Sequence, residues 1–293
     1  GKVRIIDQTK LPFEVSYLDI LTPEEMAEAI RSLRIRGAPA LGVAAAYGVV
    51  LAASRAEKRP KGLKRAMEEA IELLASTRPT AVNLFWALKR MRRLIEEKSQ
   101  GGDTRMGELL LEEALAIQRE EEEVSRRIGV NGEQLIPDRA TVLTHCNAGA
   151  LATPGWGTAL GVIYAARAKG KELRVIATET RPLLQGARLT AWELKENGVE
   201  VTLIVDGAAG LFMQRGEVDL VLVGADRVVR NGDVANKVGT YPLSVLAREN
   251  GVPFYVAAPL STFDLSLRTG REIPIEERAV EEVVALLGRR LAP

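Results

Sequence analysis

The sequence contains one cysteine and one histidine among its 293 residues, and only 4% of its residues are aromatic. One cysteine cannot form an internal disulfide, and the chain does not open with a basic segment followed by an apolar one, so we expect a cytoplasmic protein in a reducing compartment. Structural zinc sites need clusters of cysteine and histidine, which this composition excludes. We therefore expect neither a metal nor another cofactor.

Charge of one sign is not in excess, because 40 lysine and arginine residues stand against 39 aspartate and glutamate residues. This balance gives no electrostatic attraction for nucleic acid or an anionic membrane, and neither is expected as a partner. The longest apolar stretch, Ala38 to Ala53, is shorter than the roughly 20 residues that a bilayer requires. Glycine-rich phosphate loops of the dinucleotide and Walker types are also missing, so dinucleotide and nucleoside-triphosphate chemistry are not favoured.

What the sequence does contain predicts an α/β protein of two domains. Residues 1–128 form the first, a mainly helical domain with a small hairpin from two apolar runs, 3–6 and 13–18. A helix begins at Thr22 as N-cap, with Pro23 in the first turn and Glu25 as capping-box partner. Further helices of this domain are predicted at 41–54, 63–75, 81–98 and 108–128.

Residues 129–293 form the second predicted domain, which opens with a linker over 129–138. Strands and helices alternate beyond it, which favours a Rossmann-like parallel sheet flanked by helices. The predicted strands are 141–144, 174–178, 200–205, 220–224 and 253–257, and the helices are 157–168, 186–197, 208–215 and 241–250. Most of these strands are followed by polar residues. Because the carboxyl ends of parallel strands meet at one edge, we expect a small polar ligand there.

Two arginine-containing turns in the first domain are candidate anion sites. Gly37 permits close backbone approach, and the free N–H groups of the helical turn that Pro39 begins can hold an anion beside Arg36. The alternative is an ordinary turn with a solvated arginine. Arg78 is either a second anion ligand or a C-cap residue on the preceding helix, and the spacing alone does not choose between these roles.

Cys146 follows the first predicted strand of the second domain. Its alternative role is that of a small buried apolar residue, as most free cysteines are. His145 precedes it in an extended segment, so the two side chains should point to opposite faces, which argues against a Cys–His catalytic pair and for a structural histidine. One thiol, one carboxylate and several Arg, Lys, Asn and Gln side chains remain at the strand ends. This set suits acid–base chemistry on a sugar phosphate.

Five segments, in order along nearly the whole chain, resemble the methylthioribose-1-phosphate isomerases. That family shares a superfamily with archaeal ribose-1,5-bisphosphate isomerases and with regulatory subunits of a eukaryotic translation-initiation exchange factor. The segments are Arg36-Gly37-Ala38-Pro39-Ala40, Thr77-Arg78-Pro79-Thr80-Ala81-Val82-Asn83, Thr144-His145-Cys146-Asn147-Ala148-Gly149, Glu179-Thr180-Arg181-Pro182 through Gln185-Gly186-Ala187-Arg188, and Gly224-Ala225-Asp226-Arg227.

The resemblance implies a homodimer in which Cys146 carries the catalytic thiol and Asp226 the catalytic carboxylate that donates a proton. It also implies that the substrate is a sugar phosphate, 5-methylthioribose 1-phosphate, isomerised in methionine salvage. Substrate contacts then fall on Arg36, Gly37, Ala38, Arg78, Gln185, Asn236 and Lys237.

Two other functions in the superfamily remain as alternatives. A ribose-1,5-bisphosphate isomerase would need a second phosphate site, and a non-catalytic regulatory subunit would be expected to lack the catalytic thiol or carboxylate. Members of the isomerase family usually continue beyond the segment that resembles Gly288–Pro293 into a stretch with an Asn-Pro-Ala-Phe-Asp-type motif. We expect either that the chain is trimmed or that its site lacks one wall.

The implied reaction needs an acid. Phosphate on the anomeric oxygen prevents spontaneous opening of the sugar ring, so a group must protonate the ring oxygen, and burial would raise the pKa of Asp226 enough for this role. Hydrogen then moves from the second carbon to the first, through an enolate with Cys146 as base or by a direct hydride shift. The sequence leaves both routes open.

Overall fold

The computed structural model describes residues 1–56, 62–99, 105–286 and 288–292. The chain divides into two compact units: unit 1 contains Gly1–Arg127, Ala150–Gly157 and Pro259–Phe263, and unit 2 contains Ile128–Gly149, Thr158–Ala258 and Asp264–Pro293. Packing therefore divides the chain after residue 127 and assigns two later segments to unit 1. The last residue of the second predicted domain, Pro293, lies outside the described residues.

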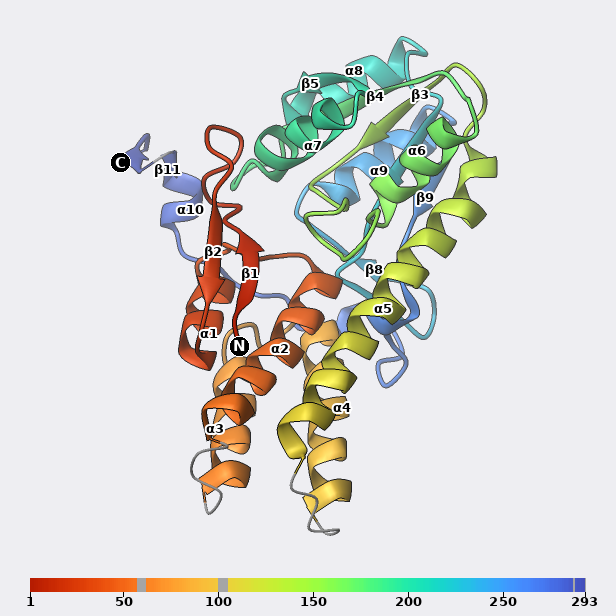
Figure 1. The fold of residues 1–293 in the computed structure, drawn as a ribbon. Coiled ribbons are helices and arrows are strands. Elements are labelled where there is room, and N and C mark those ends of the chain that lie inside the picture. Colours follow the sequence, from red (N-terminus) through yellow and green to blue (C-terminus); the bar gives the residue numbers. More distant parts are fainter. Residues whose placement is uncertain (57–61, 100–104, 287, 293) are drawn as a thin grey trace. The chain divides into compact units, whose positions relative to one another are not determined.

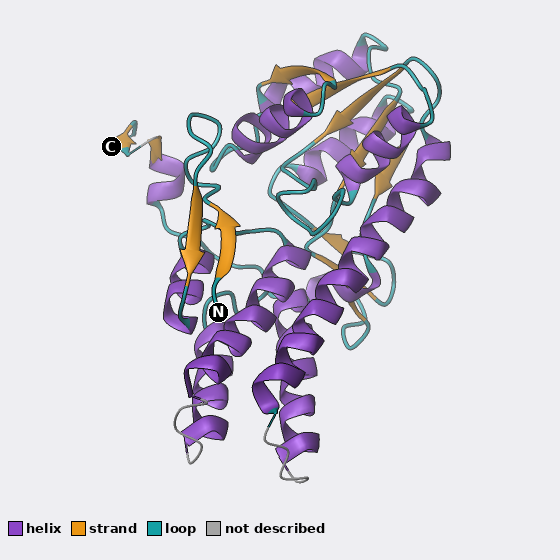
Figure 2. Ribbon diagram, viewed as in Figure 1, coloured by secondary structure: helices purple, strands orange, loops and turns teal. Residues whose placement is uncertain are grey.

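Unit 1 is built mainly from helices, as the sequence predicts (Figures 1 and 2). Its helices are α1 (Pro23–Arg31), α2 (Ala38–Ala56), α3 (Leu63–Ala75), α4 (Val82–Ser99) and α5 (Met106–Gly132) as far as Arg127. An antiparallel hairpin of β1 (Val3–Ile6) and β2 (Tyr17–Ile20) accompanies them.

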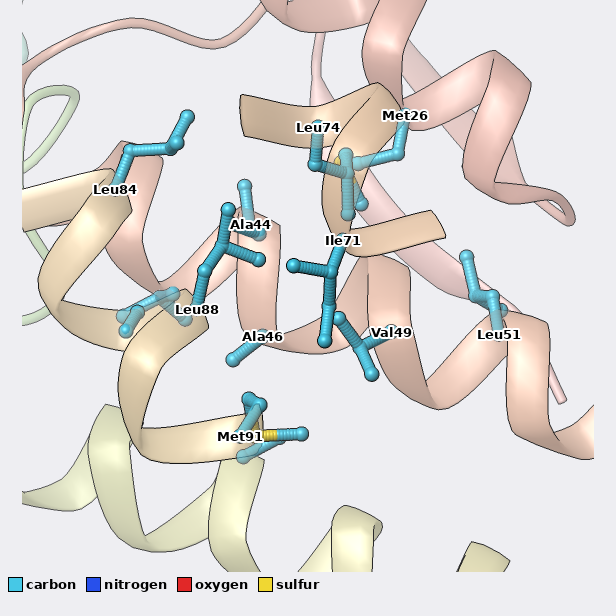
Figure 3. Close-up of a cluster of buried hydrophobic side chains, with 14 of the residues drawn as sticks. Met26, Ala44, Ala46, Val49, Leu51, Ile71, Leu74, Leu84, Leu88 and Met91 are labelled. Atoms are coloured by element: carbon cyan, nitrogen blue, oxygen red, sulfur yellow. The ribbon is translucent and has the colours of Figure 1, made fainter. Parts of the chain in front are cut away.

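Helix α2 is the core helix of unit 1. A Cβ atom on its Gly42 would lie 2.9 Å from the carbonyl oxygen of Asn83 in α4, and one on Gly48 would lie 2.7 Å from a methyl of Leu74 in α3. Figure 3 shows side chains of α2 beside those of α3 and α4. By length and composition α2 can span a membrane, contrary to our expectation from the shorter apolar stretch, but 67% of its apolar window is buried inside the protein.

Two local details near the N-terminus differ from the sequence-based expectation. The second hairpin strand begins at Tyr17, which pairs with Ile6, so residues 13–16 lie in the connecting loop rather than in a strand. The Thr22 hydroxyl accepts the N–H of Glu25 as predicted, but the Glu25 carboxylate accepts the N–H of Leu21 instead of completing the box at Thr22. The hairpin register, fixed by apolar pairing, decides the first difference.

Unit 2 contains the predicted parallel sheet, in the order β5-β4-β3-β6-β9. Its strands are β3 (Ala140–Thr144), β4 (Leu173–Thr178), β5 (Glu200–Ile204), β6 (Leu220–Val223) and β9 (Phe254–Val256). Successive residues, such as Val142 and Leu143 of β3, belong to different apolar clusters, one for each face of the sheet. The chain order along the sheet reverses between β3 and β6, which makes this pair the topological switch point.

Helices flank the sheet of unit 2, and short elements connect them. The helices are α6 (Ala159–Ala168), a π-helix at Gly186–Thr190 that runs into α7 (Ala191–Glu196), α8 (Ala209–Gln214), α9 (Thr240–Glu249) and α10 (Glu281–Val284). Short strands are β7 (Arg227–Val229), β8 (Val234–Ala235), β11 (Ala285–Leu286) and β12 (Arg289–Arg290), and single 3-10 turns lie at Glu133–Leu135, Asp206–Ala208 and Gly270–Glu272. A further 3-10 turn at Leu260–Thr262 belongs to unit 1, and β10 (Phe263–Asp264) crosses the boundary between the two units.

The predicted linker at 129–138 is wrong in its first part, because α5 continues to Gly132. The two glycines that suggested a linker are packing residues. A Cβ atom on Gly129 would lie 2.9 Å from the carbonyl oxygen of Gly161, and one on Gly132 would lie 2.6 Å from Val162, both in α6. Glycine at both positions permits α5 and α6 to approach closely, and α5 continues past Gly129.

Candidate functional site

The two candidate catalytic residues follow the two strands of the switch point. Cys146 comes two residues after β3 ends at Thr144, and Asp226 comes three residues after β6 ends at Val223. The loops that carry them touch, since a Cβ atom on Gly224 would lie 2.8 Å from the Cβ of Ala148. In open α/β sheets this crevice at the carboxyl ends of the strands is where ligands bind. Unit 2 thus brings the predicted thiol and carboxylate to one edge.

The backbone at Cys146 is held in an unusual conformation. Its φ angle is +64°, in the left-handed region that a non-glycine residue adopts at an energetic cost of order 1–3 kcal/mol. The N–H of Cys146 donates to the Thr180 hydroxyl at 2.8 Å, and the Thr190 hydroxyl donates to the Cys146 carbonyl. The thiol is free and half-buried. Two side-chain hydroxyls therefore fix the direction in which the thiol leaves the strand end.

The carboxylate of Asp206 positions Thr180. The sequence predicted that Asp206 follows a strand but gave it no role. Thr180 has φ +65°, and its N–H donates to Asp206 at 2.7 Å. The N–H of Arg181 donates to the other oxygen of Asp206, also at 2.7 Å. Asp206 follows β5, so the residue after the third predicted strand stabilises the turn after the second.

A buried polar cluster lies beneath the loop that follows Cys146. The amide of Asn147 donates to Glu193 at 3.0 Å and to the Thr190 hydroxyl at 3.2 Å, and the Tyr164 hydroxyl donates to Glu193 at 3.0 Å. Burial, and then the neighbouring Glu193 carboxylate, raise the pKa of Tyr164, which keeps the phenol protonated as a donor. Sequence reasoning missed Glu193 because its pattern is that of an ordinary helix surface, whereas the side chain is buried.

Gln185 precedes the π-helix and is buried, and its Oε1 atom has no hydrogen-bond partner among the described residues. A buried acceptor without a partner is costly, and it is commonly satisfied by a ligand or water. The next residue, Gly186, has no room for a side chain, because a Cβ atom there would lie 1.7 Å from the carbonyl oxygen of Thr178. Short π-helical segments are frequent at functional sites.

The backbone of Asp226 is tied to the strand before Asn236 and Lys237. Its N–H donates to the carbonyl of Ala235 at 2.9 Å. The amide of Asn236 donates to the Thr240 hydroxyl at 3.0 Å, at the start of α9. Unit 2 therefore brings Asp226 and both of these predicted substrate ligands into neighbouring segments. Contrary to our expectation of burial, the side chain of Asp226 is exposed to solvent in the described structure.

The remaining predicted ligands belong to unit 1. Arg36 is buried, and Gly37 has φ +99° with no space for a side chain, because a Cβ atom would lie 2.4 Å from the Cα of Ala152. The close backbone approach predicted for Gly37 is therefore present, and its partner is another part of unit 1. Ala38 is the first residue of α2, and the N–H of Ala40 donates to the carbonyl of Ala152 at 3.0 Å. One donor of the predicted anion site thus has a protein acceptor.

Arg78 lies half-buried in the turn between α3 and α4. Its carbonyl accepts the N–H of Ala81 at 3.1 Å, which closes the turn. The preceding helix ends with its own cap, in which the N–H of Ser76 donates to the carbonyl of Glu72 at 3.1 Å. The role of Arg78 as an anion ligand stays a prediction.

The comparison with known proteins decides the family. The model of the Initiation factor 2 subunit family matches residues 34–293. The chain belongs to this family. Within it, the chain is 56% identical over 293 residues to the methylthioribose-1-phosphate isomerase of Thermotoga neapolitana, which covers 100% of this chain and 84% of that protein. The predicted resemblance to these isomerases is thereby confirmed.

Two solved structures of the family have the same fold. The 5-methylthioribose 1-phosphate isomerase from Pyrococcus horikoshii OT3 matches with a TM-score of 0.92 and 47% identity, covering 100% of this chain and 82% of its own. A structure described as translation initiation factor eIF-2B, subunit delta, from A. fulgidus matches with a TM-score of 0.87 and 50% identity, covering 99% and 84%. The predicted α/β fold is confirmed by both.

Proposed function

We propose that this protein is an aldose–ketose isomerase that converts 5-methylthioribose 1-phosphate to 5-methylthioribulose 1-phosphate, a step of methionine salvage. The observation that carries the proposal is the placement of Cys146 and Asp226 after β3 and β6, on the two sides of the switch point. The identity of 56% to a methylthioribose-1-phosphate isomerase supports the choice of substrate.

In the proposed reaction the atoms of the substrate are only rearranged. The bond between the first carbon and the ring oxygen breaks as Asp226 protonates that oxygen, hydrogen moves from the second carbon to the first, and the hydroxyl on the second carbon loses its proton. Asp226 must hold a proton to begin, and a bound substrate that excludes water from this exposed carboxyl would raise its pKa. Cys146 is the base in an enolate route, or handles an oxygen proton in a hydride shift.

The substrate contacts are proposed for each unit separately. In unit 2, Lys237 supplies a point charge for phosphate, with Asn236 next to it in the chain, and the open Oε1 of Gln185 accepts a hydrogen bond from a sugar hydroxyl. In unit 1, Arg36 and Arg78 supply forked donors that suit phosphate. The backbone of Gly37 and Ala38 at the start of α2 offers N–H groups at a helix N-terminus.

We also propose that the protein is a cytoplasmic homodimer without a nucleic-acid or membrane partner. The near-neutral net charge of +1 and the resemblance to the isomerase family support this. Light scattering coupled to gel filtration tests the dimer, for which we expect twice the chain mass of 31.8 kDa. A single-chain mass at micromolar concentration would contradict it.

The experiment that tests the activity is proton and phosphorus NMR of the chain with methylthioribose 1-phosphate. We expect the ketose phosphate to form with the unchanged protein. Asp226→Asn and Cys146→Ser should each lower turnover about 10²- to 10⁴-fold, because each removes a proton-transfer group and keeps the side-chain shape. Circular dichroism and thermal unfolding serve as controls for the fold. Near-normal turnover in either variant would remove that residue from the catalytic roles.

A regulatory role is the second candidate, because one structure at 50% identity is described as an eIF-2B subunit. Cys146 and Asp226 are both present, which argues against it, since the resemblance associates their loss with the regulatory subunits. The other alternative, a ribose-1,5-bisphosphate isomerase, is tested with ribose 1,5-bisphosphate in a parallel tube. Product from that sugar alone would change the substrate, and no product from either together with a stable heteromeric complex would favour regulation.

A further inference from the structure

The single histidine of the chain lies between two segments of the proposed site. His145 directly follows β3 and is 2% exposed. Its Nε2 lies 2.8 Å from the carbonyl oxygen of Val238, and its Nδ1 lies 2.6 Å from the Thr178 hydroxyl. Because a carbonyl oxygen only accepts, the ring proton belongs on Nε2, and the Thr178 hydroxyl donates to Nδ1. Both ring nitrogens are thereby used.

The ring is neutral in this arrangement, and burial is the main cause. Burial lowers the pKa of His145, with a smaller effect in the same direction from Lys237. The bond to Val238 and the charge of Asp206 act in the opposite direction. A neutral ring is also what the hydrogen bonds require, because a protonated ring would leave Nδ1 without its ability to accept from Thr178.

On one side, His145 holds the loop that carries Asn236 and Lys237. Val238 follows these residues directly, and its side chain is 69% exposed, so burial of that side chain does not anchor the loop. Gly239 has φ +103°, and a Cβ atom there would lie 2.7 Å from the imidazole Cε1, so the backbone rests on the ring. The amide of Asn236 donates to the Thr240 hydroxyl, which donates to the carbonyl of Lys237, so both of these hydrogen bonds stay inside the same turn.

On the other side, the same cluster reaches Cys146. The Thr178 hydroxyl that donates to His145 lies 3.4 Å from the Thr180 hydroxyl, which accepts the N–H of Cys146. His145 thus lies next to Cys146 in the chain. It is also joined to the loop of Asn236 and Lys237 by its hydrogen bond to Val238, which lies 93 residues away in sequence.

We propose that His145 is a positioning residue, which holds the Val238 carbonyl and thereby places Asn236 and Lys237 relative to Cys146. This inference rests on the proposed function of those residues. It gives the histidine a role without contact to the substrate.

The kinetic test compares His145→Phe, which fills the space without hydrogen bonds, with His145→Gln, whose amide can still donate to Val238. We expect His145→Phe to raise KM for methylthioribose 1-phosphate at least about tenfold, the effect of losing one good contact. The kcat should stay within about threefold, and His145→Gln should recover most of the loss in KM. The control is Leu143→Ala, which weakens the same strand in the apolar core and should leave KM unchanged.

A double-mutant cycle with Lys237→Met identifies the segment through which His145 acts. We expect Lys237→Met to raise KM clearly in the unchanged protein and much less in the His145→Phe background, because the lysine is already misplaced there. Additive effects, or an unchanged KM in His145→Phe with wild-type turnover intact, would overturn the inference alone. Absence of turnover in the wild type would overturn the proposed function first.

The ring itself gives a readout that does not depend on activity. Because the chain has one histidine, its imidazole signals in a long-range proton–nitrogen NMR spectrum belong to His145. We expect a neutral ring with its proton on Nε2 at about pH 6.5, where an ordinary histidine is half protonated, because burial lowers the pKa of His145. A proton on Nδ1, or titration like that of a free histidine, would overturn the proposed contact with Val238.

Discussion

Different interactions order the interior of unit 1 and the candidate site of unit 2. Unit 1 surrounds α2 with apolar side chains of neighbouring helices, so its order depends on how well volumes fit (Figure 3). Unit 2 has apolar layers on both faces of its sheet, but the edge that carries Cys146 and Asp226 is ordered by hydroxyls, carboxylates and left-handed backbone positions. Loss of apolar volume should therefore lower stability in unit 1, whereas at the edge of unit 2 small changes to close backbone contacts and to polar groups should have the larger effect.

The largest effect should come from a single methyl group at the edge of unit 2. In Gly186→Ala the new Cβ would lie 1.7 Å from the carbonyl oxygen of Thr178, and backbone rather than a flexible side chain must move. We expect a loss of about 4 kcal/mol or more in the free energy of unfolding, or failure to fold. Urea denaturation measures it. As a control, Gly207→Ala adds the same methyl group where nothing lies within 4 Å. Equal stability of the two variants would contradict the close approach.

In unit 1 the strongest expected effect is a loss of core volume. Met91 of α4 is fully buried, and Met91→Ala should lower the free energy of unfolding by about 2–5 kcal/mol because a cavity remains. The fold stays the same, so KM for methylthioribose 1-phosphate should change little at a temperature where the variant is folded. Thermal unfolding and steady-state kinetics check the two parts. A changed KM with unchanged stability would contradict the claim that this core residue of unit 1 acts on stability rather than on function.

Glu121 of α5 departs from the apolar packing of unit 1, because it is a buried carboxylate whose pKa is raised. Burial is the main cause that raises its pKa, while the hydroxyl of Ser261 donates to it at 2.8 Å. A raised folded-state pKa means that the native state binds more protons, so this group's contribution to stability is present below about pH 4.5 and is lost as the pH rises through the folded-state pKa. Glu121→Gln should remove that loss.

Unfolding measured from pH 4 to pH 8 tests this prediction. We expect the wild type to lose stability relative to Glu121→Gln as the pH rises, by about 1.4 kcal/mol for each unit by which the pKa is raised. The slope is the useful quantity, since the new amide changes the absolute stability as well. Parallel curves for the two proteins would show that the carboxylate is not perturbed.

The smallest effect should come from the exposed charges of the hairpin. Asp19 accepts from Lys2 at 2.7 Å and from Arg4 at 2.7 Å, and these partners lower its pKa. Exposed ion pairs contribute little, because water and salt screen them. Asp19→Asn should leave the thermal midpoint unchanged within error at physiological salt. A clear shift of the midpoint would show that surface charges matter more in unit 1 than its core suggests.

Much of this architecture could be predicted from local sequence. The strands β3 to β6 and the helices of unit 1 lie within a few residues of their predicted positions, because apolar periodicity is set by which face is buried. Thr22 acts as an N-cap for a similar local reason. Gly129 and Gly132 misled the prediction, since a glycine that ends a helix and one that permits close helix packing look the same without the partner helix.

The site was predictable in its position and less so in its connections. Polar residues after most of the strands showed where the edge lies, but the partners that hold it are distant in sequence. His145 contacts Val238, and Asn147 contacts Glu193, 46 residues away. No local pattern encodes such pairs. The prediction that Asp226 is buried was also wrong, because its loop leaves the carboxyl at the surface of the described structure.

The most direct test of the central claim is turnover of methylthioribose 1-phosphate by the unchanged chain and by Asp226→Asn, followed by phosphorus NMR in the same buffer. The account predicts ketose phosphate with the first protein and a loss of at least about 100-fold with the second, while the unfolding curves coincide. Equal turnover by the two proteins would contradict the role of the carboxyl at the switch point. No turnover by either would contradict the proposed isomerase.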